Sequence, residues 1–145
     1  MKYLKYTWTF LAILIACLGL IYDGIYTWLL VIYAFVFIPI LELFMSGSER
    51  NLTKEEEAVV LNDRVFDWLV YLVVPLQYLL LILFCISVQR DLQAYELIGK
   101  VITFGLACGV YGINVAHELG HRIKKYEQWM AKSLLLTSQY MHFFY

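Results

Sequence analysis

The sequence lacks most of what a flexible, disulfide-linked or nucleic-acid-binding protein needs. Its 145 residues include two prolines and eight glycines, which leave little room for disordered linkers. The three cysteines, Cys17, Cys85 and Cys108, are odd in number and lie in apolar runs. We therefore interpret them as core or lipid-facing thiols and not as disulfide or metal partners. The net charge of −1 gives no indication of nucleic-acid binding.

Apolar residues are what the chain has in abundance. They make up 62% of the sequence, against roughly 45–50% in soluble domains. Four stretches approach the roughly 20 residues that a spanning helix needs, and the first is short. It has no small-residue cleavage site before Asp23, so we interpret it as a helix and not as a signal peptide. The predicted spans are residues 6–22, 24–41, 68–89 and 97–118.

These spans predict an all-α fold, a polytopic integral membrane helical bundle with four spanning helices, forming a single membrane domain over residues 1–145. Residues 126–145 mix apolar and polar positions, which indicates an interfacial helix at the start of a fifth element. Lys100 lies near the outer end of the fourth span, where its side chain can extend toward the membrane surface.

Lysine and arginine are divided unevenly between the two predicted sides of the membrane. Only Arg90 and Lys100 belong to one side. The nine others are Lys2, Lys5, Arg50, Lys54, Arg64, Arg122, Lys124, Lys125 and Lys132. Because cytoplasmic loops carry the excess of positive residues, we expect the N-terminus, the 46–67 loop and the region after the fourth span to be cytoplasmic.

The most informative motif is Asn-Val-Ala-His-Glu-Leu-Gly-His-Arg at residues 114–122, at the end of the fourth span. His117 and His121 are four residues apart, so a helix places both imidazoles on one face. Two neighbouring imidazoles at a membrane surface indicate a metal site.

Three interpretations of this motif are open from the residues alone. His117-Glu118-Leu119-Gly120-His121 fits the H-E-x-x-H pattern of zinc peptidases, in which the glutamate activates water and a third ligand is needed. Imidazole is equally suited to iron, which activates O₂ for the oxidation of apolar substrates dissolved in the bilayer. The third interpretation is that the histidines only end a helix, where positive charge is favourable.

The chain as a whole resembles the alkane 1-monooxygenases, the membrane-bound non-haem di-iron hydroxylases related to the fatty-acid desaturases. Residues 112–122 are similar to the first histidine box of that family. The other matching elements are residues 39–44 with Gly47, residues 62–64, Tyr71, residues 75–78, residues 129–132 and residues 142–144. The family usually has Asp where this chain has Glu42, and Lys where it has Arg122.

The resemblance implies terminal hydroxylation of alkanes with O₂ at a centre of two Fe ions, in a bacterial inner membrane. Rubredoxin and its reductase would supply the electrons, and membrane lipid would surround the chain. His117 and His121 would bind iron, with Glu118 and Asn114 as supporting groups, whereas we do not expect His142 to be a ligand. Family members are longer and have further histidine boxes. We therefore expect this chain to be an N-terminal part that is inactive alone.

Overall fold

The computed structural model describes residues 4–44 and 63–144, and within these residues it contains helices and no β-strand. The predicted all-α fold is therefore confirmed. Most of the predicted 46–67 loop lies outside the described residues. In chain order the elements are α1 (Leu4–Ile21), η1 (Gly24–Trp28), α2 (Leu29–Ile32), the π-helical η2 (Tyr33–Phe37), α3 (Ile38–Phe44), α5 (Arg64–Ser87), α6 (Ala94–Ala107), the π-helical η3 (Cys108–Ile113), α7 (Asn114–Gly120), α8 (Lys125–Thr137) and η4 (Met141–Phe144).

Several of these elements join end to end into three long apolar helices. Gly24–Phe44, Arg64–Ser87 and Ala94–Gly120 are each long and apolar enough to cross a membrane. The apolar part of α1, Trp8–Ile21, is shorter than the roughly 20 residues of a full span. The structure thus supports three of the four predicted spans by length and composition and leaves the first unconfirmed.

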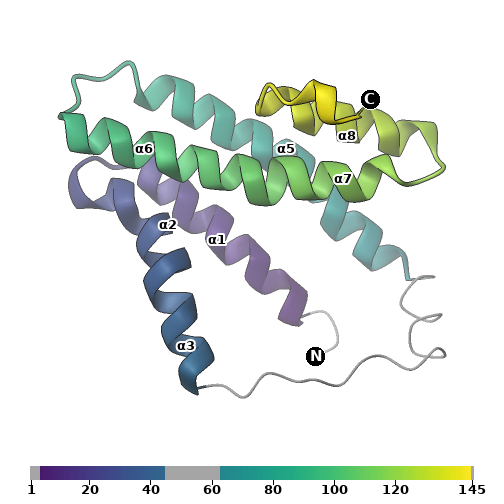
Figure 1. The fold of residues 1–145 in the computed structure, drawn as a ribbon, viewed down its shortest axis with the longest axis horizontal. Coiled ribbons are helices and arrows are strands. Elements are labelled where there is room, and N and C mark those ends of the chain that lie inside the picture. Colours follow the sequence, from purple (N-terminus) through teal and green to yellow (C-terminus); the bar gives the residue numbers. More distant parts are fainter. Residues whose placement is uncertain (1–3, 45–62, 145) are drawn as a thin grey trace.

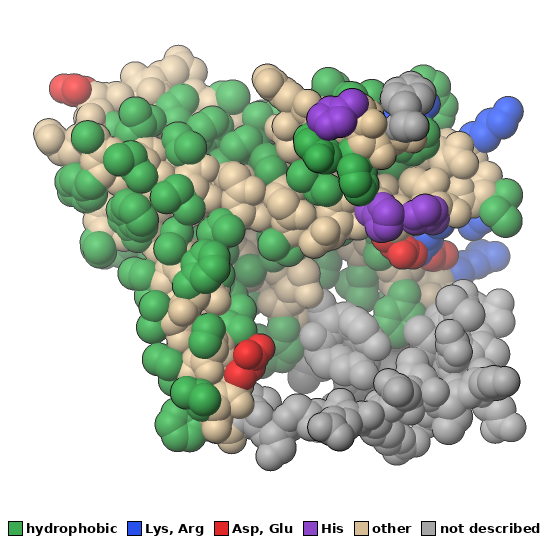
Figure 2. Space-filling model, in the orientation of Figure 1, with side chains coloured by type: hydrophobic (Ala, Val, Ile, Leu, Met, Phe, Trp, Pro, Cys, Tyr) green, Lys and Arg blue, Asp and Glu red, His purple; other side chains and the backbone are tan. Residues whose placement is uncertain are grey.

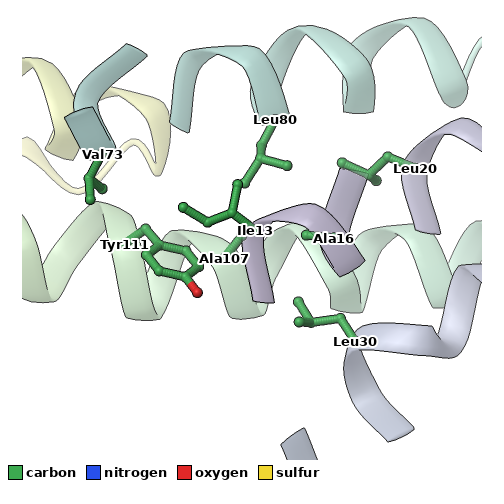
Figure 3. Close-up of a cluster of buried hydrophobic side chains, with 8 residues drawn as sticks. All are labelled: Ile13, Ala16, Leu20, Leu30, Val73, Leu80, Ala107 and Tyr111. Atoms are coloured by element: carbon green, nitrogen blue, oxygen red, sulfur yellow. The ribbon is translucent and has the colours of Figure 1, made fainter. Parts of the chain in front are cut away.

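Helix α1 packs against both α5 and α6, which also contact each other, while the helix containing α2 and α3 diverges from them (Figure 1). Figure 3 shows the core of this contact, where Ile13 and Ala16 of α1 lie among side chains of the neighbouring helices. The Tyr111 hydroxyl also donates a 2.8 Å hydrogen bond to the Thr9 carbonyl. In lipid, such close packing and interhelical hydrogen bonds are what hold apolar helices together.

We define the far end of the bundle by Asp23, Arg90 and Lys100. Here the expectation that the Lys100 side chain extends toward the membrane surface is not met. The Lys100 side chain is fully buried within the bundle and does not reach solvent. Its Nζ lies 2.9 Å from an Asp23 carboxylate oxygen and donates to the carbonyls of Leu20 and Tyr22 at 3.0 and 3.1 Å. The carbonyls at the end of α1 have no partner within their own helix, so a buried ammonium group finds acceptors there.

Helix α8 folds back along α7 and also contacts α5 (Figure 1). A second core cluster joins Ala116 and Leu119 of α7 to Ala131, Leu134 and Leu135 of α8. This packing places the predicted fifth element against the helix that carries both histidines.

Candidate metal centre

The helix that carries the histidine pair is not uniform along its length. Between α6 and α7, residues Cys108–Ile113 form a π-helical segment, which contains Gly109 and Gly112. A π-helical turn contains an extra residue and rotates the helix beyond it, and such turns are frequent at functional sites. The sequence periodicity gave no signal for this segment. It sets which face of α7 is turned toward α8.

His117 and His121 come together at the end of α7, as their spacing predicts. His121 is the C-cap residue, and its backbone N–H donates to the His117 carbonyl at 3.3 Å. The two ring centroids are 4.5 Å apart and the rings are nearly perpendicular, at 89°. Their Nε2 atoms face each other at 3.3 Å, and both side chains are exposed. The pair is therefore accessible from outside the protein.

The distance between the two Nε2 atoms fits two ligands of one metal ion. With metal–nitrogen bonds of about 2.0–2.1 Å, two ligands at 90–109° around one ion have nitrogens roughly 2.9–3.4 Å apart. Within residues 4–44 and 63–144, however, no group of three or more His, Cys, Asp or Glu side chains is arranged to hold a metal. The described residues thus supply two neighbouring imidazole ligands and an incomplete coordination sphere.

A cavity of about 380 Å³ opens beside the pair. Its lining residues are Ala116, His117, Gly120, His121, Gln128, Leu135, Phe143 and Phe144. Phe143 of η4 lies against His117, with 5.6 Å between the ring centroids. The walls are thus mainly apolar, and the two imidazoles are the groups in this cavity that suit a metal ion.

The remaining candidate residues do not join the pair. The Glu118 carboxylate is 64% exposed and lies 3.6 Å from the Arg122 guanidinium. It borders a different groove, formed by apolar side chains of α1, α5 and α7. Asn114 is exposed one turn before Glu118. The His142 ring meets the Tyr140 ring edge to face, with 4.3 Å between the centroids, and the structure records no contact between His142 and the pair.

An ion cluster that the sequence analysis did not predict lies directly after His121. Figure 2 shows histidine side chains at this end of the bundle, next to acidic and basic ones. Nη1 of Arg122 lies 2.5 Å from Asp67 of α5 and 2.9 Å from Glu127 of α8. Tyr71 donates a hydrogen bond to Glu127. Asp67 and Arg122 are separated by 55 residues, so no local pattern could have paired them.

The environment of this cluster favours its charged forms. Burial by itself would lower the pKa of Arg122, but hydrogen bonds to Glu127 and Asp67 raise it above the ordinary value. Burial by itself would raise the pKa of Glu127, but hydrogen bonds from Tyr71 and Arg122 hold it below the usual range. Both groups therefore stay ionised at neutral pH.

Comparison with known proteins gives consistent results. An alkane 1-monooxygenase of Pseudomonas putida is 29% identical over 122 residues, which cover 83% of this chain and 30% of that protein. One of Ectopseudomonas oleovorans is 30% identical over 122 residues, with the same coverage. Alkane 1-monooxygenase 1 of Alcanivorax borkumensis is 29% identical over 109 residues, or 74% of this chain and 26% of that protein.

The chain spans less than a third of the length of these curated relatives. No protein-family model matches it. These relatives are named as monooxygenases, and nothing in the structure or the comparisons supports the zinc-peptidase interpretation. Over most of its length, the chain is similar to alkane 1-monooxygenases, and the resemblance predicted from its sequence is confirmed.

Proposed function

We propose that this chain is part of a membrane-bound alkane hydroxylase that converts alkanes to primary alcohols with O₂. The observation that carries the proposal is the pair of facing imidazoles at the end of an apolar helix, in a chain similar to alkane 1-monooxygenases. In the overall reaction, one oxygen atom enters the C–H bond and the other leaves as water. Two electrons and two protons are consumed.

His117 and His121 would be metal ligands in this enzyme, in a centre of two Fe ions. A bound iron pair would supply the O₂-activating chemistry that an unactivated C–H bond requires. His117 and His121 would hold one ion of this centre: their facing Nε2 atoms lie 3.3 Å apart, and each would offer a lone pair in the tautomer that carries its proton on Nδ1. Two imidazoles cannot complete two coordination spheres, so we propose that the 145 residues alone do not hydroxylate alkanes.

Glu118 and Asn114 remain candidates for supporting roles around the metal. In the structure Glu118 pairs with Arg122, so its influence on the imidazoles would act through the end of α7 and not by direct contact. Asn114 is exposed one turn earlier and would need a partner from elsewhere.

The proposed substrate is an apolar alkane that enters from the bilayer. The groove of about 370 Å³ between α1, α5 and α7 and the cavity of about 380 Å³ beside the pair are both mainly apolar. An alkane chain and O₂ both favour such surroundings over water. The bilayer would thus deliver both reactants close to the histidine helix.

We propose that rubredoxin and its reductase supply the electrons from the cytoplasmic side of a bacterial inner membrane. Nine lysines and arginines on one predicted side against two on the other support this orientation. The start of α5 and the end of α7 lie toward the same end of the bundle, as expected if both face the cytoplasm (Figure 1). The exposed imidazoles are then within reach of soluble electron carriers.

The direct test is an oxidation assay of the complete enzyme in membranes, supplied with alkane, O₂ labelled with oxygen-18, rubredoxin and its reductase. We expect a labelled primary alcohol, detected by mass spectrometry, together with bound iron. If the enzyme binds iron and is supplied with reduced rubredoxin but forms no alcohol from any alkane tested, the proposed function is wrong.

A further inference from the structure

Three carboxylates from three helices meet one guanidinium group immediately after the histidine pair. Arg122 contacts Asp67 of α5 and Glu127 of α8 through Nη1, and Glu118 of α7 through Nη2 at 3.6 Å. The Arg122 side chain is 23% exposed and the Glu127 side chain only 2%. The Arg122–Glu127 pair is shielded from water and interacts more strongly than an exposed ion pair does, whereas Glu118 is 64% exposed.

The backbone of Arg122 is held as firmly as its side chain. Its N–H donates to the Leu119 carbonyl at 3.2 Å, and its carbonyl accepts from the Gln128 side chain at 3.0 Å. The residue therefore fixes the turn between α7 and α8. This turn begins at His121, which occupies the C-cap position of α7.

A helix end of this kind frays unless other groups hold it. Fraying would separate the two imidazoles, because His117 lies within α7 and His121 at its cap. Both imidazoles are exposed, and the packing recorded for His117 is against Phe143 of η4. Leu119 packs into the core cluster shared with α8, and Arg122 adds ion pairs to both α5 and α8 at the position directly after His121.

We propose that Arg122 is a positioning residue, which keeps His117 and His121 turned toward one metal ion by anchoring the end of α7 to Asp67 and Glu127. This inference rests on the proposed metal-binding function. The planar fork of a guanidinium group can contact several carboxylates at once, whereas a lysine ammonium is a single point of charge. The role therefore depends on the shape of Arg122 as well as on its charge.

The test uses the 145-residue chain in detergent with Cu²⁺ as the probe, because Cu²⁺ binds imidazole strongly and its electron paramagnetic resonance signal reports the number of coordinated imidazoles. The wild-type chain should bind Cu²⁺ through two imidazoles. Arg122→Gln should weaken binding roughly tenfold and shift the signal toward one imidazole, a loss typical of residues that orient metal ligands. The Cu²⁺ affinity of Arg122→Lys should lie between those of the wild type and Arg122→Gln.

The matched control is Lys125→Gln, which removes a nearby exposed cation that makes no ion pair with any described residue. It should leave the signal unchanged, since any loss there would indicate a general charge effect and overturn the proposal. Helicity measured by circular dichroism must match between variants. If Arg122→Gln does not fold, Glu127→Gln removes one anchor while keeping the side-chain shape, and it should weaken binding several-fold.

Two failures can be told apart. A folded Arg122→Gln variant that binds Cu²⁺ through two imidazoles with wild-type affinity would overturn the positioning role alone. A wild-type chain that binds Cu²⁺ through fewer than two imidazoles would overturn the metal site itself, and with it this inference.

Discussion

The two ends of the bundle use charged side chains differently. At the far end, Asp23 pairs with Lys100 and Arg90, but charged side chains there also bind backbone groups: Lys100 donates to the Leu20 and Tyr22 carbonyls, and Glu96 accepts from the Gly24 and Gln93 N–H groups. These backbone groups are the ones left without partners where helices begin and end. The polar residues of the far end therefore serve the fold.

At the histidine end, the charges bind one another. Arg122 is surrounded by carboxylates, and His117 and His121 keep their Nε2 atoms on the surface, with each other as partner. Nothing about helix termini requires that arrangement. The exposed imidazoles are the groups at this end that we propose bind a metal ion.

The sharpest test of this contrast is to remove a histidine. In the complete enzyme, His121→Ala should lower alkane hydroxylation by at least about 100-fold, because one proposed metal ligand is lost. Stability should change by less than about 0.5 kcal/mol, since the side chain is exposed. Alcohol formation and thermal unfolding of the same preparation measure both effects.

The matched control for this prediction is His142→Ala, which removes another exposed imidazole from the same chain. It should leave hydroxylation within about twofold of the wild type if His142 is not a ligand. Wild-type activity in His121→Ala, or equal losses in both variants, would contradict the assignment of the pair.

At the far end we expect a substitution to lower stability and leave metal binding unchanged. Lys100→Met fills similar space but leaves the Leu20 and Tyr22 carbonyls without their donor and removes one partner of Asp23. We expect unfolding to become easier by about 2 kcal/mol. Cu²⁺ binding by the histidine pair should be unchanged. Denaturant titration followed by circular dichroism measures the first effect, and electron paramagnetic resonance the second.

Lys125→Met is the control for that experiment, because it removes an exposed lysine outside the far end. Its stability should stay within about 0.5 kcal/mol of the wild type. If Lys100→Met is as stable as this control, the buried contacts of Lys100 do not hold the helix ends together.

These contrasts also explain what the sequence could and could not predict. The meeting of His117 and His121 depends on spacing within one helix, so the sequence alone predicts it. The Arg122 cluster joins side chains from α5 and α8, and only the folded chain brings them together. The π-helical segment before α7 has no recognisable signal in a single sequence.

The prediction for Lys100 was wrong for a related reason. A lysine near the end of one isolated apolar helix is expected to extend toward water. In the bundle, the end of α1 lies beside α6 and offers free carbonyls and Asp23 within hydrogen-bond distance of the Lys100 ammonium group. A prediction made for one helix at a time cannot take account of hydrogen-bond acceptors that a neighbouring helix supplies.

The smallest expected effect concerns pH and the far end alone. A hydrogen bond from Lys100, assisted by the charges of Lys100 and Arg90, lowers the pKa of Asp23. A carboxyl group whose pKa is lower in the folded state stabilises the fold above its ordinary pKa of about 3.9, and the stabilisation is lost as the pH falls through the folded value.

Asp23→Asn should therefore be less stable than the wild type at about pH 6, by less than about 1 kcal/mol because Asp23 is 44% exposed. The difference should shrink toward zero as the pH falls below the ordinary pKa, and denaturant titrations at the two extremes measure it. Other carboxyl groups titrate in both proteins, so their contributions cancel when the two unfolding free energies are subtracted. If wild type and Asp23→Asn differ in stability by the same amount at both pH values, the Asp23 charge does not stabilise the far end.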